Sequence, residues 1–195
     1  MEAFKNTDWD ARYQTGNTGW DIGYASTPLK EYIDQLSDKN LKILIPGSGN
    51  SYEAEYLFKK GFSNVFVADI SRYPLQNFHK RFPRFPKNQL LHTNFYEIDQ
   101  QFDLILEQTF FCAQPPSFRK AYVDKMYQLL PTSGKLVGVL FDFPLDPESG
   151  PPYGGSLEEY KKLFSGKFEI DILERAYNSI KPRQGNELFF KVVKK

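Results

Sequence analysis

The sequence is poor in cysteine, histidine and long apolar runs, and each shortage excludes a class of protein. The single cysteine, Cys112, excludes an internal disulfide and suits a reducing compartment. Two histidines, with neither an HExxH nor a CxxC pattern, give no indication of a metal site. No run approaches the roughly 18 apolar residues of a membrane-spanning helix, and the first residues, MEAFKNTDWD, do not form a signal peptide. We therefore expect a cytoplasmic protein without metal or membrane association, in which Cys112 is a small buried residue.

Net charge is also nearly absent, while aromatic residues are abundant. The 25 basic and 24 acidic residues leave a formal charge of +1, which gives no indication of a nucleic-acid partner. Aromatic residues make up 16% of the chain, and we expect a few of them to line a pocket. A length of 195 residues is most simply one domain spanning 1–195. Oligomeric state is not predicted by any of these features.

Residues 41–61, LKILIPGSGNSYEAEYLFKKG, combine a short apolar run, a glycine turn and an amphipathic segment. The run predicts a buried strand, and the segment after the turn predicts a helix that ends at Gly61. Asn50 and Glu53 have the spacing of a capping box at the start of that helix. A strand, a glycine turn and a helix start together allow a ligand to lie against backbone N–H groups.

The rest of the chain continues this alternation. Further strands are expected at 64–70, 89–95, 102–111 and 134–143, and helices at 75–82, 117–130 and 156–164, the last with a capping box of Ser156 and Glu159. Two last strands, at 168–175 and 188–195, have no helix between them. The pattern predicts an α/β fold with a Rossmann-like, doubly wound, seven-stranded sheet. It is mostly parallel, with an antiparallel pair at its C-terminal edge.

Polar and small residues gather where the first four predicted strands end. They are the turn 47–49, Asp69, Asn94 with Phe95, and Glu107 with Gln108. Since the carboxyl ends of parallel strands meet at one edge of the sheet, near the point where the strand order reverses, we expect a ligand there.

Two features narrow the choice of ligand. Asp69 lies 22 residues after Gly47, close to the spacing of about 20 at which dinucleotide-binding folds place an acidic residue on ribose hydroxyls. Tyr52 stands where G-x-G-x-x-G needs its third glycine, and no Walker lysine follows, so a pyrophosphate cradle is disfavoured. The helix start still favours a smaller anion, such as an amino-acid carboxylate. Adenosine joined to an amino-acid tail is S-adenosylmethionine (SAM).

Four stretches of the sequence also resemble the class I SAM-dependent methyltransferases, specifically the branch of thiopurine methyltransferases and plant halide/thiol methyltransferases. They are 8–29, with its spaced aromatic residues; 44–57, with Pro-Gly-Ser-Gly; 102–130; and 149–164, with Gly-Pro-Pro-Tyr. The resemblance implies that residues 1–30 cover the cofactor. The cofactor-binding residues that it implies are Trp9, Tyr13 and Trp20 in the cover, Gly47 at the methionine end, Asp69 at the ribose, Asn94 and Phe95 at the adenine, and Glu107 and Gln108 near the methionine amino group and sulfonium.

The resemblance further implies a substrate pocket formed by Phe110, Phe111 and Tyr153. Gln108 departs from the tyrosine or arginine that the family has at this position. Several of the implied residues have a plain structural alternative. Trp9 and Trp20 can anchor the N-terminal segment, and Phe95 can belong to the core.

The function that follows is SAM-dependent methyl transfer to a small soft nucleophile: a thiol, bisulfide or a halide. Such acceptors need little help from a base, so no catalytic residue is assigned. Two alternatives within SAM binding stay open, namely a methyltransferase for another small-molecule acceptor and a non-catalytic SAM-binding module. A nicotinamide-dependent dehydrogenase is the rival from another enzyme class. It is disfavoured by Tyr52 and by the lack of a hydride-site acid or base.

Overall fold

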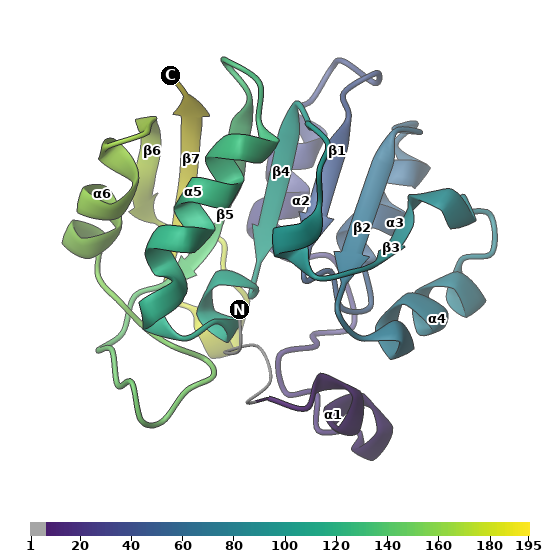
Figure 1. Cartoon of the computed structure of the whole chain (residues 1–195), viewed down its shortest axis with the longest axis horizontal. Coiled ribbons are helices and arrows are strands. Elements are labelled where there is room, and N and C mark those ends of the chain that lie inside the picture. The colour runs from purple at the N-terminus through teal and green to yellow at the C-terminus, as the bar shows by residue number, and fades with distance from the viewer. Residues whose placement is uncertain (1–6) are drawn as a thin grey trace.

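A computed structural model describes residues 7–195. Within this range, the strands form one sheet in the order β3-β2-β1-β4-β5-β7-β6 (Figure 1). Their bounds are β1 (Ile43–Pro46), β2 (Val65–Asp69), β3 (Leu90–His92), β4 (Leu104–Gln108), β5 (Lys135–Phe141), β6 (Phe168–Arg175) and β7 (Glu187–Lys194). β1 to β5 pair in parallel, and β7 is antiparallel to both β5 and β6. The predicted fold class, including the antiparallel pair at the C-terminal edge, is confirmed.

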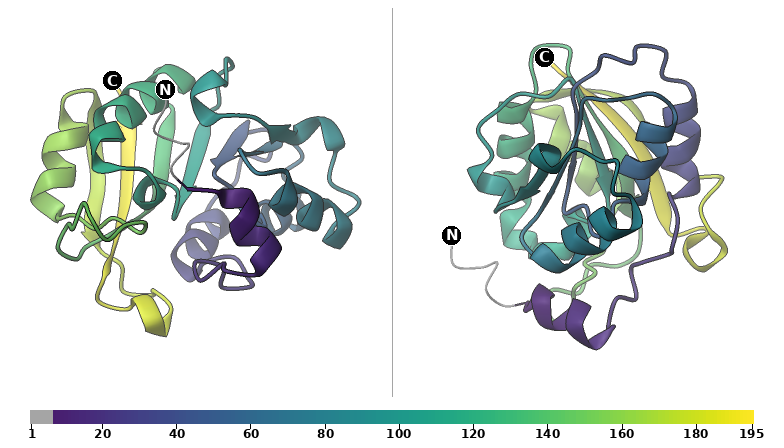
Figure 2. Two further views of the ribbon diagram at one scale, coloured as in Figure 1. Left: turned by 60° about the horizontal axis from the view of Figure 1, so that its bottom comes forward. Right: turned by 90° about the vertical axis from the view of Figure 1, so that its right-hand side faces the viewer.

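Both faces of the sheet are covered by helices. Ile43 and Ile45 of β1 pack under α2 (Thr27–Asp34), α3 (Tyr52–Lys59) and α4 (Arg72–Arg81). Leu44, which points to the opposite face, belongs to a second core with α5 (Arg119–Leu129) and α6 (Leu157–Ser165). Figures 1 and 2 show these helices as layers on either side of the sheet. Burial on both faces explains why the strands read as continuous apolar runs.

Several elements are shorter or begin elsewhere than the sequence predicts. β4 ends at Gln108 rather than at 111, because Thr109 adopts a left-handed conformation with φ of 56°. β3 has three residues. α4 begins at Arg72, where the hydroxyl of Ser71 accepts a hydrogen bond from the N–H of Tyr73. The 3-10 turns are η2 (Lys87–Gln89), η3 (Phe95–Glu97), η4 (Phe111–Ala113), η5 (Pro116–Phe118) and η6 (Lys181–Arg183).

The capping box predicted for Asn50 and Glu53 is wrong. Ser51 is the N-cap of α3, in a left-handed conformation and without a side-chain capping bond. Asn50 and Glu53 turn to other partners: the Asn50 amide donates to Asp21, and the Glu53 carboxylate accepts from the N–H of Ser26 at 2.8 Å. At α6 the cap is present, since the Ser156 hydroxyl accepts from the N–H of Glu159 at 3.3 Å.

The helix α1 (Trp9–Thr15) was not expected from the sequence, nor was α2. Asp8 caps α1 by accepting from the N–H of Ala11 at 2.9 Å, and Gly16, with φ of 72°, ends it. α1 lies across the carboxyl-end edge of the parallel strands rather than on a sheet face (Figures 1 and 2). None of its residues is buried, and it contacts α4, where Gln14 hydrogen-bonds Tyr73. Within the predicted covering segment 1–30, residues 1–6 lie outside the described residues.

No helix within residues 7–195 combines the length and the apolar character needed to cross a bilayer.

Candidate active site

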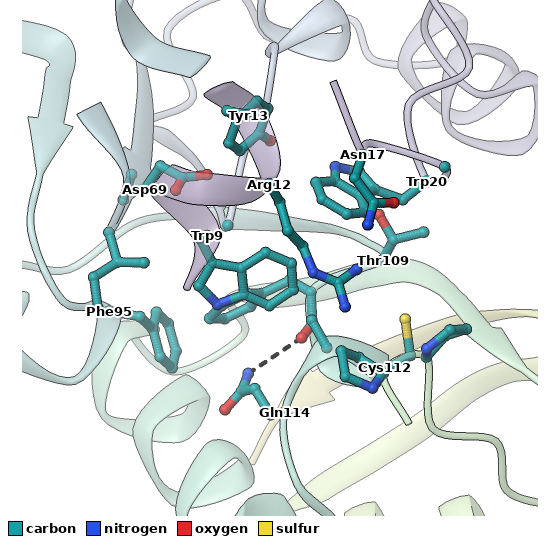
Figure 3. Close-up of a pocket in the computed structure, with 18 of the residues that line it drawn as sticks. Trp9, Arg12, Tyr13, Asn17, Trp20, Asp69, Phe95, Thr109, Cys112 and Gln114 are labelled. Carbon is teal, nitrogen blue, oxygen red and sulfur yellow. Dashed lines mark hydrogen bonds between the residues drawn. The ribbon is translucent and has the colours of Figure 1, made fainter. Parts of the chain in front are cut away.

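A cavity of about 290 Å³ opens at the carboxyl ends of β1, β2, β4 and β5, beneath α1 (Figure 3). β1 and β4 are neighbours in the sheet, and the strand order reverses between them, which is where open α/β sheets bind their ligands. Most of the predicted site residues line this cavity: Trp9, Tyr13, Trp20, Gly47, Asp69, Asn94, Phe95 and Phe110. The cavity therefore brings together predicted residues from five separate parts of the chain.

The glycine turn forms the floor of the cavity below β1. Gly47 and Gly49 have φ of 55° and 50°, a region that disfavours residues with a Cβ. A Cβ on Gly47 would also lie 2.1 Å from the ring of Phe110. The turn is tied to the end of β2, because the N–H of Ser48 donates to the carbonyl of Ala68 at 3.0 Å.

Asp69 is held in place by two backbone donors. Its Oδ2 accepts from the N–H of Gly49 at 3.0 Å, and its Oδ1 accepts from the N–H of Ser71 at 2.9 Å. Burial raises the pKa of the Asp69 carboxyl from 3.8 to about 6, although both N–H donors favour the ionised form. A carboxylate has about four lone-pair sites, so roughly two remain for hydroxyl donors of a ligand.

The N-terminal segment places an aromatic cluster over the cavity. The rings of Trp9 and Trp20 meet edge to face at 5.4 Å, and Tyr13 meets Trp20 in the same way at 5.7 Å. Burial, and then the nearby charge of Asp69, raises the pKa of Tyr13 above its usual range, so its phenol is neutral at pH 7. Arg183 secures the segment from below by donating to the carbonyl of Trp20 at 2.8 Å.

Asn94 and Phe95 form the wall beside Asp69. The Oδ1 of Asn94 accepts from the N–H of Tyr96 at 3.1 Å and so caps η3. The ring of Phe95 lies 5.1 Å from that of Phe110 and is 5% exposed. Phe95 thus belongs to the core and also lines the cavity, while its contact with an adenine stays a prediction.

Glu107 does not line the cavity. It is fully buried behind the end of β4, where Oε1 accepts from the N–H groups of Phe110 and Phe111 at 2.8 and 2.9 Å. Its Oε2 accepts from the hydroxyl of Tyr122 at 2.7 Å. Burial raises the pKa of Glu107 from 4.5 to about 7. The carboxyl group organises the chain after β4, and in this structure a ligand in the cavity would not reach it.

Phe111 and Tyr153 also lie outside the set of lining residues. Phe111 is 3% exposed and packs against Tyr122 and Tyr160, at ring distances of 4.9 and 5.7 Å. Tyr153 packs on Gly150, and its N–H donates to the carbonyl of Cys112 at 2.7 Å. The loop of Tyr153 reaches the cavity through Pro151 and Pro152 instead.

Gln108 lines a second, smaller cavity of about 50 Å³ on the other side of the glycine turn. Two amide oxygens at this side cavity, Oε1 of Gln108 and Oδ1 of Asn50, are buried and have no hydrogen-bond partner among the described residues. Two carboxylates, Asp21 and Glu53, line it as well. The two unpaired amide oxygens give the side cavity acceptors for an ammonium group.

Among the lining residues that the sequence did not indicate are two arginines, Arg12 and Arg183. Arg12 follows Trp9 by three residues and precedes Tyr13, so the spacing typical of one helix face could have identified it. Arg183 had no local signal, because it meets Trp20 from the far end of the chain. Cys112 is 6% exposed, as predicted, and burial raises the pKa of its thiol above the usual range.

Within residues 7–195, no group of three or more His, Cys, Asp or Glu side chains is placed to hold a metal ion.

The fold is shared with SAM-dependent methyltransferases. A Burkholderia thailandensis 1,6-didemethyltoxoflavin-N1-methyltransferase, solved with S-adenosylhomocysteine (SAH), superimposes with a TM-score of 0.76 at 18% identity, covering 95% of this chain and 84% of that one. TehB from Haemophilus influenzae superimposes with a TM-score of 0.67 at 14% identity, covering 95% of this chain and 66% of that one.

The sequence places the chain within that class. The family model described as thiopurine S-methyltransferase matches residues 4–192, and the chain belongs to this family. A probable thiol methyltransferase 2 of Arabidopsis thaliana is 31% identical over 187 residues, which cover 92% of this chain and 81% of the plant protein. A thiopurine S-methyltransferase of Acinetobacter baylyi is 22% identical, over 91% of this chain and 92% of its own. The protein is a SAM-dependent methyltransferase.

Proposed function

We propose that the enzyme transfers the methyl group of SAM to a small soft nucleophile: a thiol, bisulfide or a halide. One observation carries this proposal. The cavity has an aromatic cover and apolar walls, and no described histidine or lysine lines it. A soft nucleophile is reactive without a strong base, so alignment and removal of water are the tasks left to the protein.

The main cavity fits the adenosine part of SAM. Asp69 is fixed by Gly49 and Ser71 and keeps acceptor capacity for two ribose hydroxyls. Phe95 offers a ring and Asn94 an amide beside it, which suits an adenine base. These roles are the ones that the sequence resemblance implies.

The side cavity fits the amino-acid tail of SAM. The unpaired oxygens of Gln108 and Asn50 would accept hydrogen bonds from the α-ammonium group. Gln108 lines the side cavity and not the main cavity. In this proposal the glutamine at this position, which departs from the family pattern, would bind the amino-acid tail of the cofactor and would not contact the methyl acceptor.

The sulfonium of SAM supplies an electrophilic methyl group and leaves as a neutral thioether. Trp9, Tyr13 and Trp20 would cover that cation with aromatic faces and exclude water from it. Phe110 would flank the acceptor, with Pro151 and Pro152 across the cavity. Phe111 would act behind them through Tyr122, which also contacts Phe110, and Tyr153 would fix the proline loop through its bond to Cys112.

The names of the relatives agree with a sulfur acceptor. They are a probable thiol methyltransferase, a thiocyanate methyltransferase of Brassica oleracea and a bacterial thiopurine S-methyltransferase. We extend from them only the soft character of the accepting atom. The acceptor is thus proposed to be a small molecule, and the reaction to take place in the cytoplasm, as the cysteine content suggests.

The test begins with binding and ends with turnover. Calorimetric titration should show that SAM and SAH bind and that NAD does not. Formation of SAH is then measured with bisulfide, a set of thiols, iodide and bromide. Binding of SAM without turnover of any of these acceptors would contradict the proposed acceptor class. Absence of SAM binding at millimolar concentration would contradict the cofactor site itself.

A further inference from the structure

Among the described residues, three charged side chains line the main cavity: Arg12, Asp69 and Arg183. Two of them have fixed partners. Asp69 accepts from two backbone N–H groups, while Arg183 donates to the carbonyl of Trp20 and has a Glu187 carboxylate oxygen 3.5 Å away. No carboxylate within residues 7–195 forms an ion pair with Arg12.

Arg12 reaches from α1 into the cavity and lies beside two indole rings that contact each other. Its guanidinium carbon lies 5.6 Å from the ring centre of Trp9 and 5.7 Å from that of Trp20 (Figure 3). Guanidinium groups are weakly hydrated and are attracted to aromatic rings, so the contact with the two indoles is favourable. Its N–H donors point in the plane of the group, where the indole rings offer no acceptor.

A second cation belongs to the same cavity. The proposed function brings the sulfonium of SAM beneath the Trp9, Tyr13 and Trp20 cover, and two positive charges in one aromatic cavity repel each other. An anion beside both charges removes this repulsion and satisfies the N–H donors of Arg12. The cavity with Arg12 and the cofactor is therefore complementary to a small anion.

We propose that Arg12 is the residue that selects the methyl acceptor by charge, holding it as an anion beside the sulfonium. The acceptors favoured are thiolates, bisulfide and the heavier halides, and neutral soft nucleophiles are disfavoured. This inference rests on the proposed function. It adds the charge state of the methyl acceptor and the residue that recognises that charge.

The reaction that Arg12 serves is balanced without a base. A lone pair of the anionic sulfur or halide forms a bond to the methyl carbon, while the bond between that carbon and the sulfonium sulfur breaks and its electron pair stays on the sulfur. The anion and the sulfonium both become neutral. A thiol loses its proton to solvent before transfer. Because the acceptor's charge falls along the reaction, Arg12 holds the bound anion at least as tightly as the transition state.

Kinetic measurements should therefore distinguish an anion-binding role of Arg12 from a purely structural role. Substituting Arg12→Gln should raise KM for iodide or bisulfide by about tenfold to hundredfold, since one charge-assisted contact is lost, and should leave kcat within about threefold. For a thiol acceptor, the apparent pKa in the kcat profile should rise in Arg12→Gln, because the bound thiolate loses its cation. Arg12→Lys keeps the positive charge, so its KM for the anion and its apparent pKa in the kcat profile should stay close to the wild-type values.

Intrinsic fluorescence tests the anion site without any turnover. Trp9 and Trp20 are the two tryptophans of the chain, so all tryptophan emission reports on this cavity. Iodide should quench the wild-type protein and Arg12→Lys more strongly than neutral acrylamide does. In Arg12→Gln this preference for iodide should fall at least about threefold. Arg84→Gln, an exposed arginine just beyond α4, is the matched control and should behave as the wild type.

The outcomes distinguish the two proposals. Iodide preference that depends on Arg12, with no methyl transfer to any acceptor, keeps the anion site and rejects the proposed function. Methyl transfer with equal iodide quenching in wild type and Arg12→Gln keeps the function and rejects the anion site. A rise of acrylamide quenching in Arg12→Gln would show that α1 has moved in this variant. The iodide preference is then compared between the wild type and Arg12→Lys, which keeps the charge, and its loss in Arg12→Lys would also overturn the proposal.

Discussion

The N–H of Gly49 donates a 3.0 Å hydrogen bond to Oδ2 of Asp69. This bond joins the turn after β1 to the end of β2, and it fixes the carboxylate toward the cavity. The donor and the acceptor each belong to a segment that the sequence singled out for a different reason, one for its glycines and the other for its acidic residue. Their contact makes the turn and the carboxylate one unit of the site.

Asp69 should make SAM binding sensitive to pH. Ribose hydroxyls donate to the ionised carboxylate, and the pKa of Asp69 is raised to about 6. The affinity for SAM should therefore be constant above pH 7 and fall by up to about tenfold per pH unit below pH 6. In Asp69→Asn the affinity should be about tenfold to hundredfold lower at pH 8 and should lack this dependence. Calorimetry at pH 5 to 8 measures both.

A matched control for this prediction is Asp38→Asn, an exposed aspartate in the loop before β1. It should bind SAM as the wild type does at every pH. An affinity that stays pH-dependent in Asp69→Asn would assign the titration to another group.

Gln108 should affect only ligands that carry an amino-acid tail. Gln108→Leu removes one of the two unpaired amide oxygens of the side cavity. We expect the affinity for SAM and for SAH to fall about tenfold, since a hydrogen bond to a charged donor is lost. Methylthioadenosine, which keeps the adenosine but lacks the tail, should bind equally to both proteins. Gln76→Leu, on the exposed side of α4, is the control. A weaker binding of methylthioadenosine would show that Gln108 acts on the adenosine site instead.

The sequence predicted those site residues whose positions follow from strand ends. Gly47, Asp69, Asn94 and Phe95 lie at or within three residues of the ends of β1, β2 and β3, and parallel pairing brings such ends to one edge. Sequence could not separate Phe110 from Phe111. The strand stops at Gln108, and the backbone then turns through Thr109 with a positive φ. Side-chain direction beyond that point depends on contacts with Glu107 and Tyr122, which no local pattern encodes.

The N-terminal residues show the same limit in another form. Trp9, Tyr13 and Trp20 were predicted from the family resemblance, while Arg12 was not, because the helix that carries it was not recognised. Asp8 and Gly16 had the character of helix caps and could have indicated α1. Arg183 depends on tertiary structure alone, since η6 brings it to Trp20 only in the folded chain.

The glycine at position 47 should be far less replaceable than the glycine that ends α3. Gly47→Ala combines a φ of 55° with a Cβ 2.1 Å from the Phe110 ring. We expect a loss of about 3 kcal/mol in the free energy of unfolding, together with loss of SAM binding. Gly61→Ala, with φ of 91° and no atom within 4 Å of its Cβ, should lose about 1 kcal/mol and bind SAM normally. Urea unfolding and calorimetry compare the pair, and equal losses would show that the Phe110 contact relaxes freely.

Glu107 should lower stability as the pH rises. Burial raises its pKa in the folded chain to about 7, above the 4.5 of an exposed glutamate, so the folded state binds this proton more readily than the unfolded state. The free energy of unfolding should therefore fall between pH 4.5 and pH 7, by about 3 kcal/mol from this group. Asp69 adds a fall of the same sign between about pH 4 and pH 6.

Glu107→Gln should remove the part of this slope that belongs to Glu107. A glutamine can accept from the N–H groups of Phe110 and Phe111 with its oxygen and donate to the Tyr122 hydroxyl with its nitrogen, so the contacts are preserved. Urea unfolding at pH 5, 6, 7 and 8 should give similar stabilities for the two proteins at pH 5. At pH 8 the variant should be more stable, by about 1–3 kcal/mol. Because Glu107 does not line the cavity, SAM affinity should be unchanged. A stability curve parallel to that of the wild type would mean that Glu107 is already ionised in the folded protein at pH 5, whereas a loss of SAM affinity would place Glu107 in the cofactor site after all.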